Sequence, residues 1–451
     1  MSRFKRYERY KDSGVEWIGE IPEEWDVLKL KWIFKLVYRY PTYYGIQYSD
    51  NGVIEVRGEM LKGNGLIDVE SCEPRFISEE ISNNYPMTKL KKDDIVMSVR
   101  GTMGKIGLVT DNIENANITA NLLRLSPNKN KVYSKWLVWL MESSRFNEEL
   151  DNYSDQTTIK TIRVPNLLSI NIPLPKYDEQ NAIANFLYQK TAEIDGLIAD
   201  KEKLIELLQE KRQAIITEAV TKGLNPNVRM KDSGIEWIGE IPEHWGVEPI
   251  KYLVKTIQTG TTPTTKNDDY FDGDIQWFTP GDFQGSKELY ESSRKISNRA
   301  IIDNEARLFP KNTVMIVGIG ATVGKVAKLG IEGSFNQQIT GLIVNEQRLN
   351  CDYLYYWLYI NQETIKNISN YTTLPIINNE FVKNFECLSL PLDEQQAIVN
   401  YLNQKTSEID DLILKIRLQI QKLKEYRQSL ISEAVTGKID VREFGSISEV
   451  I

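Results

Sequence analysis

Two glycine-rich segments that end in lysine are the parts of this chain best suited to hold a phosphate. Gly318–Lys325 (GIGATVGK) follows a β-like run at Thr313–Val317. Arg100–Lys105 (RGTMGK) follows a similar run at Ile95–Val99. A tight turn that presents backbone N–H groups, one hydroxyl and one lysine suits a phosphate of a nucleic-acid backbone. The alternative is a structural hairpin turn with an exposed lysine.

Nucleotide-binding sites of the familiar kinds do not fit the second segment. A dinucleotide site requires a helix after the glycines, whereas residues 326–333 (VAKLGIEG) bring two more glycines and no helical period. A P-loop requires Ser or Thr after the lysine to bind magnesium, and Val326 stands there. The spacing of Gly318 and Gly320 from Gly324 is also wrong for a P-loop.

The residue types that carry catalysis are scarce. The single histidine, His244, excludes two-histidine metal sites, and the corresponding position of an internal repeat holds Glu24, which indicates an exposed polar site. No lysine has an acidic residue two positions before it, as PD-(D/E)xK nucleases require, and no Pro-Pro occurs, as amino-methyltransferases require. The sequence therefore predicts a chain that is not an enzyme.

Composition narrows the class of protein. The 451 residues are 41% hydrophobic and 26% charged, with a net charge of -8, so a uniformly basic coat for nucleic acid is excluded but a local basic face is not. No run approaches the roughly 18 apolar residues of a membrane span, and no apolar stretch follows the basic N-terminus. Three scattered cysteines suit a reducing compartment. We expect a cytoplasmic protein without membrane contact.

The chain is an internal duplication. Residues 11–25 and 231–245 differ at two of fifteen positions, at an offset of 220. Residues 178–221 and 393–436 share about 25 of 44 positions, at an offset of 215. A period of this length indicates two copies of one domain with its connector rather than a solenoid.

The second repeated segment predicts long helices. Asp178 and Asp393 follow a proline closely and resemble N-caps. Apolar residues then step by about 3.5 positions, which predicts two coiled-coil seams that bury each other, each about 40 Å long from Glu193 to Val220 or the equivalent. The predicted seam positions are Ile194, Leu197, Lys201, Leu204, Leu208, Lys211 and Ile215, and Ile409, Leu412, Ile416, Gln419, Leu423, Tyr426 and Leu430.

The first repeated segment is aromatic, with Trp17, Trp25, Trp237 and Trp245. We interpret it as packing that pins the start of each domain to the helices, and a ligand-binding aromatic box is the alternative. The order of the repeats further predicts that the N-terminal copy docks near the C-terminal helix. Between the repeated segments, the variable parts mix β-like runs with a helix-like aromatic stretch, at Tyr133–Glu142 and Tyr353–Ile360.

These features predict an α+β fold, with two mixed α/β domains joined by two long antiparallel coiled-coil helices and related by a pseudo-two-fold. The predicted boundaries are 1–175 for the first domain, 176–223 for a central helical spacer, 224–391 for the second domain, and 392–451 for the C-terminal helical spacer and tail.

The combination of motifs resembles the DNA-sequence-specificity subunit of Type I restriction-modification enzymes. The motifs are S-G-[VI]-E-W-I-G-E-I-P-E-x-W, the glycine turn ending in Gly-Lys, and D-E-Q-x-A-I-x-x-[FY]-L-x-x-K-T-x-E-I-D followed by a helix ending in E-A-V-T. Together they cover essentially the whole chain.

The resemblance implies that each variable domain is a target recognition domain that reads one half of a split site in double-stranded DNA. The helices would set the spacer and dock two adenine-N6 methyltransferase subunits, and a restriction and translocase subunit would join them. Family members catalyse nothing, so no cofactor is expected on this chain. S-adenosylmethionine, ATP and magnesium would belong to partner subunits.

Candidate DNA-binding residues follow from side chains that can meet phosphates or base edges. We expect Lys105 and Lys325 to act as phosphate clamps rather than base readers. The full set is Arg100, Thr102, Lys105, Thr322, Lys325, Tyr44, Gln47, Lys62, Lys266, Gln284, Lys287, Thr158 and Thr373. Plain solvent exposure is the alternative for each of them.

Two other functions stay open at this point. A coiled-coil adaptor whose variable lobes hold proteins would show no DNA footprint. An enzyme acting on carbohydrate or nucleotide would need a convergent pair of carboxylates.

Overall fold

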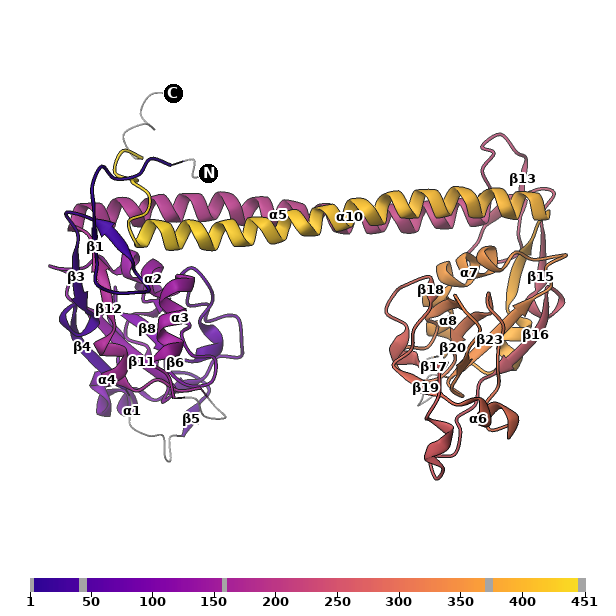
Figure 1. Cartoon of the computed structure of the whole chain (residues 1–451), viewed down its shortest axis with the longest axis horizontal. Helices are drawn as coiled ribbons and strands as arrows, with labels where there is room; N and C mark the ends of the chain where they lie inside the picture. Colours follow the sequence, from indigo (N-terminus) through magenta and orange to yellow (C-terminus); the bar gives the residue numbers. More distant parts are fainter. Residues whose placement is uncertain (1–3, 40–46, 156–159, 370–375, 445–451) are drawn as a thin grey trace. The chain divides into compact units, whose positions relative to one another are not determined.

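The computed structural model describes residues 4–39, 47–155, 160–369 and 376–444. The chain forms two compact units, unit 1 (Met1–Glu202 with Arg417–Ile451) and unit 2 (Lys203–Ile416). Figure 1 shows that each unit combines a mixed α/β domain with parts of two long helices, α5 (Tyr177–Lys222) and α10 (Leu392–Val435).

The described part of the unit 1 domain is built from short strands and short α-helices. Its strands are β1 (Tyr10–Asp12), β2 (Glu20–Pro22), β3 (Asp26–Lys29), β4 (Phe34–Arg39), β5 (Tyr48–Ser49), β6 (Val53–Val56), β7 (Phe76–Ile77), β8 (Ile95–Ser98), β9 (Ile106–Leu108), β10 (Asn117–Ile118), β11 (Leu122–Pro127) and β12 (Asn171–Leu174). Its helices are α1 (Glu79–Asn84), α2 (Ser134–Glu142), α3 (Ser144–Asn152) and α4 (Val164–Ser169).

The domain of unit 2 follows the same plan. Its strands are β13 (Met230–Asp232), β14 (Glu240–Pro242), β15 (Gly246–Pro249), β16 (Val254–Thr259), β17 (Ile275–Phe278), β18 (Glu288–Leu289), β19 (Arg294–Ile296), β20 (Val314–Val317), β21 (Val326–Leu329), β22 (Ser334–Phe335), β23 (Ile339–Val344) and β24 (Glu386–Ser389). Its helices are α6 (Asn298–Ile302), α7 (Cys351–Ile360), α8 (Gln362–Ser369) and α9 (Asn379–Asn384).

Sheet topology confirms the internal duplication. The antiparallel order β4-β11-β8-β9 in unit 1 recurs as β16-β23-β20-β21 in unit 2, where β18 extends the edge. The parallel pair β6·β10 recurs as β17·β22, and β3·β12 recurs as β15·β24. The predicted α+β fold with two equivalent domains is therefore correct.

The predicted β-like and helix-like runs lie at the centre of each domain. All four residues of β8 and of β20 are buried, as expected for apolar strands with neighbours on both edges. The aromatic stretches form α2 and α7, which contact β9 and β21. Their matching tryptophans, Trp139 and Trp357, are buried, and the Trp357 indole donates to the carbonyl of Glu386 (2.9 Å).

The long helices begin slightly earlier than predicted. Asp178 and Asp393 lie inside the first turns of α5 and α10, so the prediction that they are N-caps was wrong. Their charge still favours the N-terminal end of each helix, because the unpaired N–H groups there carry partial positive charge.

The prediction of which residues form the coiled-coil seam was partly correct. Ile194 and Leu208 of α5 face inward as predicted, as do Ile409, Ile416 and Leu430 of α10. The alternate positions are shifted by one residue, because Leu197, Leu204, Leu412 and Tyr426 are 43–50% exposed whereas Ile198, Ile413 and Ile420 are buried. Seam positions of a heptad are separated alternately by three and four residues, and the sequence does not show which of the two spacings comes first. Leucines stand on both sides of the seam, so both orders place apolar residues in it.

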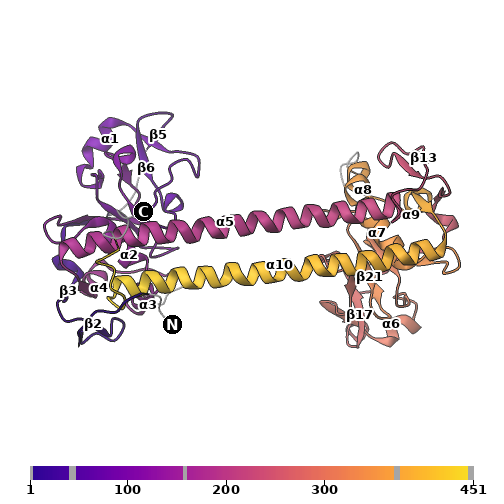
Figure 2. The ribbon, with the colours of Figure 1, turned by 90° about the horizontal axis from the view of Figure 1, so that it is seen from above.

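Within each unit the two helices lie side by side and run antiparallel (Figure 2). In unit 1, Asp195 pairs with Arg427 (2.9 Å) and Lys201 donates to Gln419 (2.7 Å). In unit 2, Arg212 pairs with Asp410 (3.1 Å). Arg427 and Asp195 match Arg212 and Asp410 at the repeat offset, so both units contain the same interhelical ion pair.

The aromatic segments pin the domains to the helices, as predicted. The indole of Trp25 donates to Glu179 in the first turn of α5 (3.0 Å), and Trp245 donates to Glu394 in the first turn of α10 (2.9 Å). His244, predicted to be an exposed polar residue, is exposed and contacts Glu394 (2.7 Å). These contacts attach each aromatic segment to the start of a long helix.

The N-terminal aromatic segment docks on the end of α10, as the order of the repeats predicted. Gly437 adopts a positive φ of 73°, and a Cβ there would lie 2.3 Å from Pro22. The ammonium of Lys438 donates to the carbonyl of Ile18 (3.1 Å), and the N–H of Asp440 donates to the carbonyl of Lys5 (2.8 Å).

Among the described residues, no helix is both long and apolar enough to cross a membrane.

Candidate nucleic-acid interface

Each glycine turn closes an antiparallel hairpin, from β8 to β9 and from β20 to β21. The N–H of Gly104 donates to the carbonyl of Ser98, and that of Gly324 donates to Val317, both at 2.9 Å. No helix follows the glycines, because β21 begins at Val326. This agrees with the exclusion of a dinucleotide site.

The glycine that directly precedes the lysine of each turn has a structural cause. Gly104 and Gly324 both have a φ of 87°, a conformation that disfavours other residues. A Cβ on Gly104 would lie 2.7 Å from Asn147 of α3, and one on Gly324 would lie 2.9 Å from the carbonyl of Gln362 in α8. Packing therefore explains the glycines, while the lysines that follow them, Lys105 and Lys325, are exposed.

The glycine turn lies beside the segment that flanks the Thr-Thr pair in both repeats. In unit 1 the N–H of Gly101 donates to the carbonyl of Lys160 (3.3 Å). The backbones of Arg100 and Thr161 form an isolated antiparallel β-bridge. In unit 2 the N–H of Ile377 donates to Gly318 (2.8 Å). The predicted residues Thr158 and Thr373 themselves lie outside the described residues, as does Tyr44.

A polar loop of each domain meets the same hairpin. In unit 1 the N–H of Leu108 donates to the carbonyl of Gly65 (2.7 Å), and in unit 2 that of Lys328 donates to Lys287 (2.8 Å). Lys325 in turn donates to the carbonyl of Phe283 (3.2 Å). The structure thus brings together three of the predicted segments in each repeat: the glycine turn, the flank of the Thr-Thr pair, and the polar loop.

In unit 1 the glycine turn and the polar loop line a cavity of about 670 Å³ with the helices. Lys62 and Lys105 face it, together with Glu142 and the paired Arg427 and Asp195. Burial raises the pKa of Glu142 to about 7, although it accepts a hydrogen bond from the N–H of Gly65 (2.9 Å). A carboxyl with this pKa is partly protonated near neutral pH, so Glu142 offsets the charge of the two lysines less than an ordinary carboxylate would.

The remaining predicted residues are placed less centrally. Gln47, Arg100, Thr102, Lys266 and Gln284 are exposed, whereas Thr322 is half-buried. Each stays a prediction as a DNA contact.

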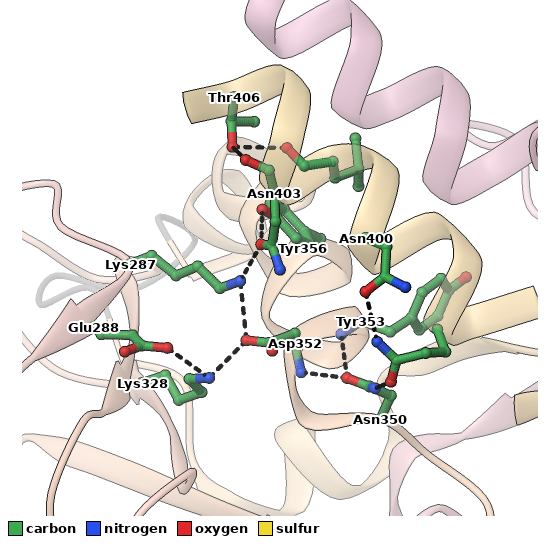
Figure 3. Close-up of polar contacts among 12 residues, drawn as sticks. Lys287, Glu288, Lys328, Asn350, Asp352, Tyr353, Tyr356, Asn400, Asn403 and Thr406 are labelled. Carbon is green, nitrogen blue, oxygen red and sulfur yellow. Dashed lines mark hydrogen bonds and ion pairs between the residues drawn. The ribbon is translucent and has the colours of Figure 1, made fainter. Parts of the chain in front are cut away.

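Lys287 has a different environment from the other candidates (Figure 3). Its side chain is 23% exposed and its ammonium pairs with Asp352 (3.0 Å). Asp352 also pairs with the buried Lys328 (2.7 Å), which reaches Glu288 (2.8 Å). Sequence reasoning missed Lys328 and Asp352, because nothing in their spacing indicates that they meet.

Comparison with known proteins identifies the family. The family model for the Type I restriction modification DNA specificity domain matches residues 22–207 and 242–422, one match for each repeat. The chain is 24% identical, over 98% of its length and 99% of the relative, to the MjaX type I restriction enzyme specificity subunit of Methanocaldococcus jannaschii. It is 28% identical to the EcoBI specificity subunit of Escherichia coli over 44% of this chain and 42% of the relative.

Two solved structures share the fold. One is a chain from a study of complex assembly and conformational transition of the type I R-M system, with a TM-score of 0.72 and 15% identity over 93% of this chain and 99% of that one. The other is the HsdS subunit of Thermoanaerobacter tengcongensis, with a TM-score of 0.54 and 16% identity over 93% of this chain and 98% of that one. The protein belongs to the family of Type I restriction-modification DNA specificity subunits, as its motifs indicated.

Proposed function

We propose that this chain reads a two-part sequence in double-stranded DNA, one half with each domain, for a methyltransferase that it does not itself supply. The observation that carries the proposal is the repeated site. Each domain presents a glycine turn, the flank of a Thr-Thr pair and a polar loop in the same arrangement, and the family model matches each repeat separately. We assign the recognition domains to residues 1–175 and 224–391, and the helical spacers to 176–223 and 392–451.

The divergence of the two domains supports a split, non-palindromic site. Two identical domains related by a two-fold would read the same half-site twice. Here the glycine turns differ (RGTMGK and GIGATVGK), as do the polar loops beside them. Each half-site is therefore expected to have its own sequence.

Exposed leucines on the helices support docking of partner subunits. In unit 1, Leu197 and Leu418 are 50% and 55% exposed. In unit 2, Leu204, Leu207 and Leu414 are 43–58% exposed. Several large apolar side chains exposed to solvent along one helix pair favour a protein interface. We propose that two methyltransferase subunits dock there, one on each unit, that a restriction subunit joins this core, and that S-adenosylmethionine, ATP and magnesium are bound by those partners.

The direct test is to co-express the chain with the methyltransferase gene adjacent to its own and to map N6-methyladenine across the host genome. We expect one bipartite motif with an unread spacer, and native mass spectrometry should give two methyltransferase copies per chain. The chain expressed alone should methylate nothing. A continuous motif, or methylation by the chain alone, would contradict the proposal.

Lys105→Ala and Lys325→Ala should weaken DNA binding by the assembled complex without changing the preferred sequence. A phosphate contact contributes affinity and salt dependence but little sequence information. The slope of log K against log salt should fall by about 1 for each phosphate that the complex no longer binds.

The matched control is Lys92→Ala, because Lys92 is an exposed lysine that pairs with Asp111 (2.8 Å) and is not among the candidates. It should leave the salt slope unchanged. An altered methylation motif in either of the two test variants would mean that the lysine reads a base.

A further inference from the structure

The ammonium of Lys287, a predicted DNA-binding residue, is held by side chains of the protein itself. Its ammonium pairs with Asp352 of α7 (3.0 Å) and donates to Oδ1 of Asn403 on α10 (2.7 Å). It also lies over the ring of Tyr356, 4.7 Å from the centroid. An ammonium has three N–H donors, so two hydrogen bonds and one aromatic face occupy its binding directions.

Asn403 is the point where α10 receives these contacts (Figure 3). Its Oδ1 accepts from Lys287 and also from the hydroxyl of Tyr356 (2.9 Å). The backbone of Lys287 is held by β21, since its carbonyl accepts from the N–H of Lys328 (2.8 Å). The side chain of Lys287 therefore joins three elements: the loop before β18, helix α7 and helix α10.

Burial lowers the pKa of the Lys287 ammonium, and the charge of Asp352 opposes this effect. Asp352 is shared with Lys328, whose side chain is only 4% exposed. Burial alone would raise the pKa of Asp352, but the hydrogen bond from Lys328 and the charge of Lys287 lower it below its ordinary value. Asp352 therefore stays ionised, and a permanently charged, half-buried carboxylate holds the ammonium in place.

The same loop reaches the helices in unit 1 through different residues. Gly65 occupies the backbone position of Lys287, since its carbonyl accepts from the N–H of Leu108 on β9. Its neighbour Asn64 donates to Asp195 of α5 (3.3 Å) and accepts from Arg427 of α10. Both repeats thus use this loop to attach the domain to the helix pair, although the chemistry of the contact is not repeated.

We propose that Lys287 is a positioning residue that fixes the second domain on α10 and thereby helps to set the spacer of the recognised DNA, rather than a residue that reads DNA. The proposal rests on the proposed function, because a spacer exists only if the chain reads a split site. A domain free to shift on its helix would accept half-sites at more than one separation while recognising the same bases.

The test variant is Lys287→Met in the complex with the methyltransferase. Methionine keeps an apolar stem against Tyr356 and removes the charge and the hydrogen bonds, while Asp352 remains paired with Lys328. We expect both half-site sequences to persist. Methylation at sites with a spacer one base pair longer or shorter should rise at least about tenfold relative to the natural site, because the variant loses the contacts of Lys287 with both Asp352 and Asn403.

Three further variants make the result specific. Asn403→Ala should also broaden the spacer, and the double variant should have less effect than the sum of the two single ones, because both remove the hydrogen bond between Lys287 and Asn403. Lys287→Arg keeps the positive charge and should retain much of the selectivity for the natural spacer length. The matched control is Lys383→Met, because Lys383 pairs with Glu380 on its own helix α9 (3.4 Å) and should leave the spacer unchanged.

Hydrogen exchange supplies a readout that does not depend on DNA. Amides of residues 284–289 should exchange about tenfold faster in Lys287→Met than in Lys383→Met, for the same free-energy reason. Unchanged exchange and an unchanged spacer would overturn the proposal, as would a changed base in the half-site. If the unmodified complex shows no bipartite motif, the proposed function fails, and the exchange experiment alone then decides whether Lys287 positions the domain.

Discussion

Replacing residues 246–390 with the matching segment of another specificity subunit should change one half of the methylated sequence and leave the other half intact. The structure provides natural junctions for this exchange. Gly246 at the start of β15 pairs with Ser389 at the end of β24, so the two ends of the segment lie on neighbouring strands. The graft therefore enters and leaves the domain at one two-stranded sheet.

The expected effect is large, because specific sites are typically bound 10³-fold or more tightly than other DNA. Methylation at the original second half-site should fall to background, and mapping of N6-methyladenine in the host genome would measure it. The reciprocal exchange of residues 26–174, bounded by the pair Asp26 and Leu174, should change only the other half. An exchange that altered both halves together would contradict independent reading by the two domains.

The same exchange has a consequence for the spacer. The grafted segment carries away Lys287 and Asp352 but leaves Asn403 on α10. A donor segment without a lysine at this position should show the broadened spacer expected for Lys287→Met, and restoring the lysine should narrow it again.

The duplication and the fold class could be predicted because they depend on patterns that sequence displays directly. The repeat of residues 11–25 at 231–245 required only comparison. The strand at β8 followed from a short β-like run, and the helix at α2 followed from a helix-like aromatic stretch. The docking of Trp25 beside α5 followed from the aromatic composition of its segment, and that of the N-terminal segment on α10 followed from the order of the repeats.

The phase of the coiled coil could not be predicted with the same success. Ile198 and Leu197 are neighbours of similar hydrophobicity, and either could lie in the seam. Which of the two residues lies in the seam depends on what the opposite face of the helix contacts. Leu197 is 50% exposed, which is consistent with a second apolar surface on the helices, and a sequence pattern cannot separate a seam from a docking face.

The junction between each domain and its long helix shows a related limit. Gln180 follows the conspicuous Asp-Glu pair at the start of α5, yet its role emerges only in three dimensions. It is fully buried, donates to the carbonyl of Pro175 (2.9 Å) and accepts from the N–H of Tyr133 (2.7 Å). Gln395 makes the equivalent bonds to Leu390 and Asn350. A buried amide and an exposed amide look alike in sequence.

Lengthening α5 and α10 together by one heptad should lengthen the DNA spacer without changing either half-site. The insertions belong after Glu202 in α5 and after Ile416 in α10, where each helix passes from one unit to the other. Seven residues preserve the phase of the seam on both sides of each insertion. They add about 10 Å of helix, which corresponds to about three base pairs of DNA at ~3.4 Å per base pair.

Methylation mapping of the lengthened complex would measure the new spacer. A four-residue insertion in α5 alone is the matched control. It rotates Leu208 and the following seam residues away from their partners on α10, so we expect a lower melting temperature and loss of methylation rather than a new spacer. If the matched heptads leave the spacer at its original length, the helices do not set the separation of the half-sites, and the distance must be determined by the partner subunits instead.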